Sequence, residues 1–195
     1  MKVATMNGAA GELESPASAA WSSVRSEQVT LGAIPVASQP TAYIRETWGS
    51  RKYASTASAK VAAATDGERL YVRLEWADDA EGNGEFPDAA AAVFGNGEAG
   101  ALGAPEKPVS LWYWQDGRRD ALEIVSRGPG VFRRHGGDGI SAASALEGGR
   151  WAVVLSGPAS VAQGAKLGVA VWNGTNEERA GLGAVSQAWL GLEQA

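Results

Sequence analysis

The residues of this sequence best suited to hold a ligand are its eight tryptophans: Trp21, Trp48, Trp76, Trp112, Trp114, Trp151, Trp172 and Trp189. Flat indole rings can stack on sugars or on a planar cofactor, but they also fill β-sheet cores and interfaces with partners. Trp112 and Trp114 flank Tyr113, so in a strand they share one face. If Tyr113 points inward, both tryptophans face solvent. An exposed pair of this kind predicts a docking surface or a ligand platform.

Metal and nucleophile chemistry has few carriers in this chain. The sequence has one histidine, His135, and no cysteine, which excludes disulfides, thiolate zinc sites and Cys-ligated iron–sulfur clusters. A single histidine cannot build a multi-histidine site, so His135 is either an axial heme ligand or an exposed loop residue. The sequence has neither a nucleophile elbow nor a phosphate-binding loop. The sequence therefore offers no recognised catalytic motif of these kinds.

Length and charge narrow the class further. With 195 residues the chain is long enough for a core of its own, and its net charge of −5 argues against nucleic acid and anionic membrane surfaces. No apolar run is long enough to span a bilayer, so we expect no direct membrane insertion. The opening segment has no apolar stretch typical of a secretory signal peptide. Either the protein faces the cytoplasm, it is exported with a partner, or a leader was removed.

The elements that must position these residues are predicted to be strands. Residues 1–18 are small and polar, which indicates a flexible N-terminal arm or a strap across a partner. The clearest pattern begins at the Asp66-Gly67 turn, after which apolar residues alternate with polar ones from Leu70 to Trp76. Similar short patterns recur along residues 19–195. We predict a single all-β domain, an antiparallel β-sandwich of about seven to ten strands with short helical or irregular loops.

Several segments, in order, resemble one family. These are AKVAAATDGERLYVRLEWADD, LGAPEKPVSLWYW and GVAVWNGTNEERAGLGAVSQAWLGL, within a similarity that runs from about Pro16 to Leu192. The chain resembles the γ subunits of the ethylbenzene dehydrogenase and dimethylsulfide dehydrogenase type. The resemblance implies a sandwich akin to DOMON cytochrome domains that holds one heme b. It also implies an electron-relay role beside two partners, an iron–sulfur β subunit and a molybdopterin catalytic α subunit. By the same resemblance the chain is not an enzyme by itself and does no substrate chemistry.

The resemblance also implies where the heme ligands should be. The family's axial methionine and lysine fall at Leu102 and Gly183 in this sequence, and neither residue can donate electrons to iron. We therefore expect either a heme-free structural subunit or altered ligation by Lys107 or His135. Lys107 lies in the same predicted loop as Leu102. A further departure is Gly157, where the family tends to have an arginine.

Three tryptophans, Trp112, Trp114 and Trp172, complete the set of residues expected at a cofactor site. Trp112 and Trp114, which share one face of the predicted strand, also support a different class of function. Carbohydrate-binding modules on a similar sandwich also use paired tryptophans to stack on sugar rings. A third hypothesis is a DOMON-like cytochrome that acts without partners. The family segments favour the γ subunit over the carbohydrate-binding module, and the missing axial ligands weigh against the free-standing cytochrome.

Overall fold

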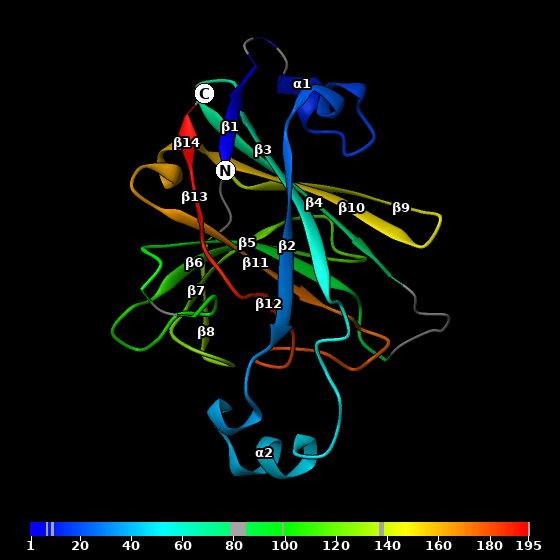
Figure 1. The fold of residues 1–195 in the computed structure, drawn as a ribbon, viewed down its shortest axis with the longest axis vertical. Coiled ribbons are helices and arrows are strands. Elements are labelled where there is room, and N and C mark those ends of the chain that lie inside the picture. Colours follow the sequence, from blue (N-terminus) through cyan, green and yellow to red (C-terminus); the bar gives the residue numbers. More distant parts are fainter. Residues whose placement is uncertain (7, 9, 79–84, 99, 137–138, 195) are drawn as a thin grey trace.

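The computed structural model describes residues 1–6, 8, 10–78, 85–98, 100–136 and 139–194. Within them the chain forms fourteen strands, most of them paired antiparallel, which confirms the all-β prediction (Figure 1). The strands are β1 Lys2–Thr5, β2 Ser26–Ala33, β3 Ser58–Thr65, β4 Arg69–Ala77, β5 Ala89–Gly95, β6 Val109–Gln115, β7 Leu122–Ser126, β8 Phe132–Gly136, β9 Ser141–Glu147, β10 Arg150–Pro158, β11 Lys166–Trp172, β12 Ala184–Ser186, β13 Leu190–Gly191 and β14 Glu193–Gln194. Fourteen exceeds the seven to ten expected, because pieces as short as β12, β13 and β14 leave no periodicity in the sequence.

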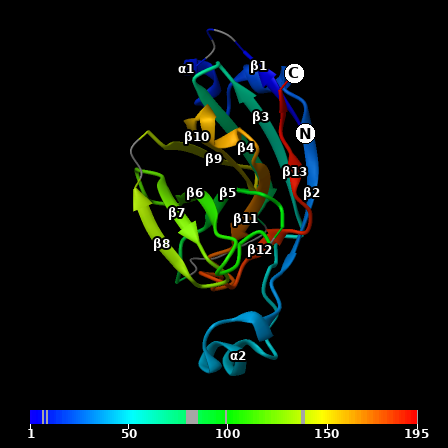
Figure 2. The ribbon, with the colours of Figure 1, turned by 90° about the vertical axis from the view of Figure 1, so that its left-hand side faces the viewer.

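Two layers arise from one continuous sheet that folds over at β2. The first part of β2, Ser26–Thr30, pairs with β3, and its last part, Leu31–Ala33, pairs with β12. One layer therefore contains β3, β4, β10 and β9, and the other contains β12, β11, β5, β6, β7 and β8. Figure 2 shows β2 and β3 on one side and β7 and β8 on the other. The largest buried cluster draws apolar residues from both layers, as a sandwich core requires.

The predicted hairpin joins β3 to β4. Its turn lies one residue later than expected, because the Asp66 N–H donates to the Arg69 carbonyl and leaves Gly67 and Glu68 as the connecting pair. Gly67 has a φ of +102°, a conformation that favours glycine. On β4 the apolar residues from Leu70 to Trp76 point into the main core, as their alternation predicted.

The N-terminal segment, which the sequence predicted to be a flexible arm or a strap, lies against the sheet over its described residues. Residues Lys2–Thr5 form β1, which pairs in parallel with β14 and with β3. Leu13, at the end of the short helix α1 (Ala10–Leu13), is completely buried in a cluster with Tyr71 of β4. The Arg73 Nε donates to the Pro16 carbonyl at 2.9 Å. The outer face of β4 is therefore covered by this segment, which packs as part of the domain.

Helical structure is limited to short pieces. The 3-10 turns are Ala19–Ser23, Val36–Ser38 and Ala159–Ala162. Helix α2 (Ala42–Trp48) begins where the Thr41 hydroxyl accepts from the Ile44 N–H at 3.3 Å, and it lies at one end of the molecule in both views (Figures 1 and 2). Among the described residues, no helix has the length and apolar character needed to cross a bilayer.

Candidate functional site

Trp112 and Trp114 lie inside the sandwich, so the expectation of an exposed pair is wrong. Their exposed fractions are 1% and 4%, and it is Tyr113 that points to the other face of β6. The Trp114 ring packs against Trp151 of the opposite layer, with 4.9 Å between ring centroids. Trp112 lies against Gly157 of β10, where an added Cβ would come within 2.6 Å of the indole. Neither ring is available as a platform for a sugar.

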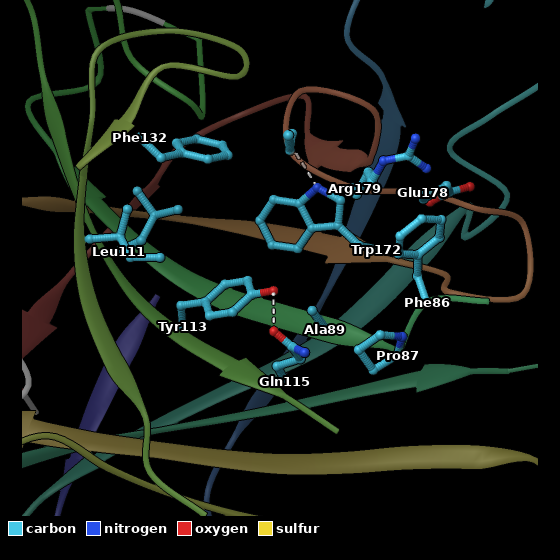
Figure 3. A pocket seen from close by; sticks show the side chains of 12 residues that line it. Phe86, Pro87, Ala89, Leu111, Tyr113, Gln115, Phe132, Trp172, Glu178 and Arg179 are labelled. Atoms are coloured by element: carbon cyan, nitrogen blue, oxygen red, sulfur yellow. Dashed lines mark hydrogen bonds between the residues drawn. The ribbon is translucent and has the colours of Figure 1, made fainter. Parts of the chain in front are cut away.

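Trp172 is the one residue of the predicted trio that faces a cavity. It is the last residue of β11, and its Nε1 donates to the Ala180 carbonyl at 2.9 Å. Its ring meets the Tyr113 ring edge-on, with 5.6 Å between centroids and 65° between planes. The hydrogen bond ties the end of β11 to the loop that follows, residues 173–183. Trp172 is thereby held in place between that loop and the outer face of β6 (Figure 3).

Leu102 and Gly183, the two expected ligand positions, both lie next to buried apolar groups. Leu102 is 2% exposed and belongs to the same buried cluster as Trp172. Its carbonyl accepts from the Ser126 hydroxyl at 2.6 Å. At Gly183, an added Cβ would lie 2.6 Å from both Cδ1 and Nε1 of Trp172. The Trp172 indole therefore occupies the space that a side chain at position 183 would need.

Lys107 and His135, the two proposed substitute ligands, lie elsewhere. The Lys107 ammonium pairs with the Glu98 carboxylate at 2.9 Å, and its side chain is 46% exposed. His135 is an exposed residue of β8. Neither lines the cavity beside Trp172. Over the described part of the chain, no group of three or more histidine, cysteine or acidic residues could hold a metal ion.

The cavity beside Trp172, which we call the Trp172 cavity, has a volume of about 300 Å³. Four aromatic residues from separate parts of the chain line it: Phe86, Tyr113, Phe132 and Trp172. Figure 3 shows these side chains with Leu111 between Tyr113 and Phe132, and it also labels Gln115, Glu178 and Arg179 among the lining residues. The cavity therefore lies on the outer face of the second layer, opposite the side that carries Trp112 and Trp114.

The only carboxylate among the described lining residues is already fully engaged. Glu178 is 1% exposed and accepts hydrogen bonds from the Ser55 N–H at 2.8 Å, the Asn173 N–H at 3.1 Å and the Asn176 amide at 2.8 Å. These bonds fasten the 173–183 loop to the segment before β3. Because burial without partners would be costly for a carboxylate, Glu178 has a structural role here.

The remaining polar groups of the cavity are mainly hydrogen-bond donors. Burial raises the pKa of Tyr113 to about 12, so its hydroxyl keeps its proton. That hydroxyl donates to the Gln115 Oε1 at 3.3 Å. The Arg179 guanidinium lies over the Phe86 ring, 4.2 Å from its centroid, at the exposed rim.

The described lining of the cavity does not fit the axial pair that the resemblance implies. It contains no methionine, lysine, histidine or cysteine. Tyr113 is the remaining residue of a type known to ligate heme iron, and its raised pKa disfavours the phenolate that would do so. Phe86, Tyr113, Phe132 and Arg179 were not predicted as site residues. The segment Glu178–Gly183 could have pointed to Arg179, but only its last residue, Gly183, was predicted to belong to the site.

No protein-family model matches the chain. Three relatives do. A respiratory nitrate reductase heme subunit from Haloferax mediterranei is 33% identical over 89% of this chain and 66% of its own length. The chlorate reductase subunit gamma of Ideonella dechloratans is 32% identical over 97% of this chain and 83% of its own. The dimethylsulfide dehydrogenase subunit gamma of Rhodovulum sulfidophilum is 31% identical over 67% and 58%. The chain thus spans just under two thirds of the first relative and less of the third.

The fold is similar to that of a solved structure from Bacteroides uniformis, which is described as a carbohydrate-binding protein. It superposes with a TM-score of 0.51 over all of this chain and 92% of its own. The two sequences are 12% identical, so the likeness concerns the sandwich architecture alone.

Proposed function

We propose that this chain is the non-catalytic γ-type subunit of a multi-subunit oxidoreductase. The chain belongs to the family of the chlorate reductase and dimethylsulfide dehydrogenase gamma subunits. Its expected partners are an iron–sulfur β subunit and a molybdopterin-containing α subunit, which would carry out the substrate chemistry. The similarity over 97% of the chain to a gamma subunit is the main support for this role. The scarcity of residues suited to catalysis is consistent with an accessory part.

We further propose that this subunit works without an axially ligated heme. The observation that carries this proposal is the contact between Gly183 and Trp172, where an added Cβ would lie 2.6 Å from the indole. A lysine could not extend from this position without displacing the tryptophan. Leu102, at the other expected position, offers no donor atom to iron. Lys107, the nearest substitute in sequence, is paired with Glu98 at the surface.

In this role the chain acts through its surface rather than through a redox centre. It would cap the iron–sulfur subunit or dock an electron acceptor. Tryptophans are poor candidates for these contacts, since seven of the eight are buried. The large apolar side chains that are exposed are Tyr43 on α2, Val131 and Leu146. They are the first positions at which to look for partner contacts.

Purification of the native complex through a tag on this chain tests both parts of the proposal. We expect molybdenum and iron in the metal analysis, and an absorption spectrum without a Soret band stoichiometric with this chain, before and after dithionite. The cytochrome fraction of the same cells, measured by the pyridine test, controls for heme supply. Absence of molybdenum and iron–sulfur partners would contradict the subunit role. A stoichiometric heme b would instead make the chain an electron relay.

A further inference from the structure

The Trp172 cavity remains open, although Leu102 is buried and the Trp172 indole lies against Gly183 at the two expected ligand positions. Its volume of about 300 Å³ is at the lower end of the range of small-molecule sites, roughly 300–1,000 Å³. Trp172 lies between Gly183 and the cavity: one edge of its indole contacts Gly183, and the ring also lines the cavity. The presence of Leu102 and Gly183 at the expected ligand positions therefore does not close the cavity.

Its walls are suited to a flat apolar body. Tyr113 comes from β6, Phe132 from β8 and Trp172 from β11, so three of the rings are held by separate strands, and Phe86 lies in the segment before β5. Trp172 and Tyr113 meet edge to face, with 65° between their planes, so their contact covers a face of only one of the two rings. Leu111 and Ile124 add apolar surface between them.

The polar groups around these walls select for acceptor atoms. Glu178, the only described carboxylate of the lining, has its oxygens occupied by three donors. The Gln115 amide and the Arg179 guanidinium can each donate, and the Tyr113 hydroxyl can do so by giving up its bond to Gln115. An incoming ligand therefore meets donors, with the Arg179 guanidinium at the rim and the Glu178 oxygens turned to protein donors.

We propose that the Trp172 cavity binds a planar aromatic molecule of one or two rings that carries acceptor oxygens on one edge. The ring body lies among the four aromatic side chains. The oxygens accept from Arg179 and from the Tyr113 hydroxyl, which exchanges its bond to Gln115 for one to the ligand. A carboxylate and a ring carbonyl share this chemistry, and the experiment below separates them. This inference rests on the heme-free part of the proposed function, since a heme in the same region would compete for the cavity.

Saturation-transfer NMR on the purified full chain tests the inference with three probes of matched ring size. These are 2-naphthoate, 1,4-naphthoquinone and, without acceptor oxygens, naphthalene. The chain contains no cysteine, so the quinone forms no thiol adduct. We expect at least one oxygen-bearing probe to bind with a Kd at least tenfold lower than that of naphthalene. Equal binding of all three probes, or binding of none, would overturn the proposal.

Variants identify the groups that bind the oxygens. Tyr113→Phe keeps the ring and removes the hydroxyl, and we expect it to weaken the oxygen-bearing probe by about three- to tenfold, the usual effect of one hydrogen bond. Arg179→Gln should weaken 2-naphthoate more than 1,4-naphthoquinone if a carboxylate is the preferred group, and both equally little if a carbonyl is. Arg150→Gln, an exposed arginine in the other layer, is the matched control. Affinity unchanged in both cavity variants would count against the proposed site.

An absorption spectrum of the same preparation separates the two proposals. Heme bound to the chain would contradict the heme-free part of the proposed function. A heme-free, folded chain that binds none of the probes would contradict only the ligand inference and leave the subunit role intact.

Discussion

At the scale of single residues, the contact between Gly183 and Trp172 accounts for the altered site. Glycine has no Cβ, so the indole can lie against the backbone at this position, and Trp172 is fixed there by its hydrogen bond to the Ala180 carbonyl. A side chain at 183 and a tryptophan at 172 in its present orientation exclude each other sterically. The absence of a side chain at position 183 and the present position of the Trp172 ring therefore depend on each other.

The close contact between Gly183 and Trp172 predicts that Gly183→Ala is destabilising. Forcing a methyl group to within 2.6 Å of the indole should lower the free energy of unfolding by about 1–3 kcal/mol, as overpacking of a core usually does. Replacing Trp172 by the smaller phenylalanine in the same chain should recover part of that loss. Urea unfolding of the two single variants and the double variant measures the coupling. Gly191→Ala is the control, because its Cβ would meet nothing within 4 Å. Equal costs at both glycines would refute the steric argument.

Tyr113 predicts a loss of stability in alkali. Burial raises the pKa of Tyr113 in the folded chain to about 12, whereas the unfolded chain releases this proton near pH 10. Between these values the unfolded state holds fewer protons, so the free energy of unfolding falls as pH rises, and stability is fully present below pH 10. The loss from this group should reach about 1 kcal/mol at pH 11.

Urea titrations from pH 8 to pH 11 measure this effect. Tyr113→Phe removes the phenol and should flatten the alkaline decline relative to the unchanged chain. Tyr43→Phe alters a tyrosine that is 74% exposed and should leave the decline as it was. The same slope in all three proteins would show that Tyr113 does not keep its proton through burial.

At the scale of elements, β6 shows what alternation can and cannot predict. The pattern identified Trp112 and Trp114 as neighbours on one face. Both faces of β6 are apolar, however, because the inner face meets the first layer and the outer face is covered near the 173–183 loop. Period-two alternation separates two faces and does not say which one is inside. The orientation depended on contacts with β4 and β10, which are distant in sequence.

The N-terminal segment gives a second test at this scale. Leu13 is completely buried against the outer face of β4, so Leu13→Ala should lower the free energy of unfolding by about 2–5 kcal/mol. Its neighbour Glu12 is exposed, and Glu12→Ala should change stability little. Urea midpoints of the two variants are the measurement. Similar small effects at both positions would mean that the segment does not pack on the sheet in solution.

At the scale of the whole molecule, the two layers share one core. Trp114 of the second layer contacts both Trp76 and Trp151 of the first, with centroid distances of 6.1 and 4.9 Å. Strand β2 also joins the two layers, because its first part pairs with β3 of one layer and its last part pairs with β12 of the other. Neither layer can bury its apolar face without the other, so the chain should behave as one folding unit.

We therefore expect a single cooperative unfolding transition. Far-UV circular dichroism reports the strands and tryptophan fluorescence reports the shared core, and both should give the same urea midpoint. Trp114→Leu should move both midpoints down together, since it removes a contact between the layers. Two separated transitions in either protein would show that the layers unfold independently.

Local sequence patterns sufficed for the all-β class, the β3–β4 hairpin and the membership of the gamma-subunit family. They also showed which side chains stand at Leu102 and Gly183, because donor chemistry is a property of residue type. Tertiary structure alone decided which face of β6 is buried, that Lys107 pairs with Glu98, and that Phe86, Tyr113, Phe132 and Trp172 enclose one cavity. The reason is physical: periodicity arises from neighbours along a strand, whereas burial and cavities arise from contacts between strands far apart in the chain.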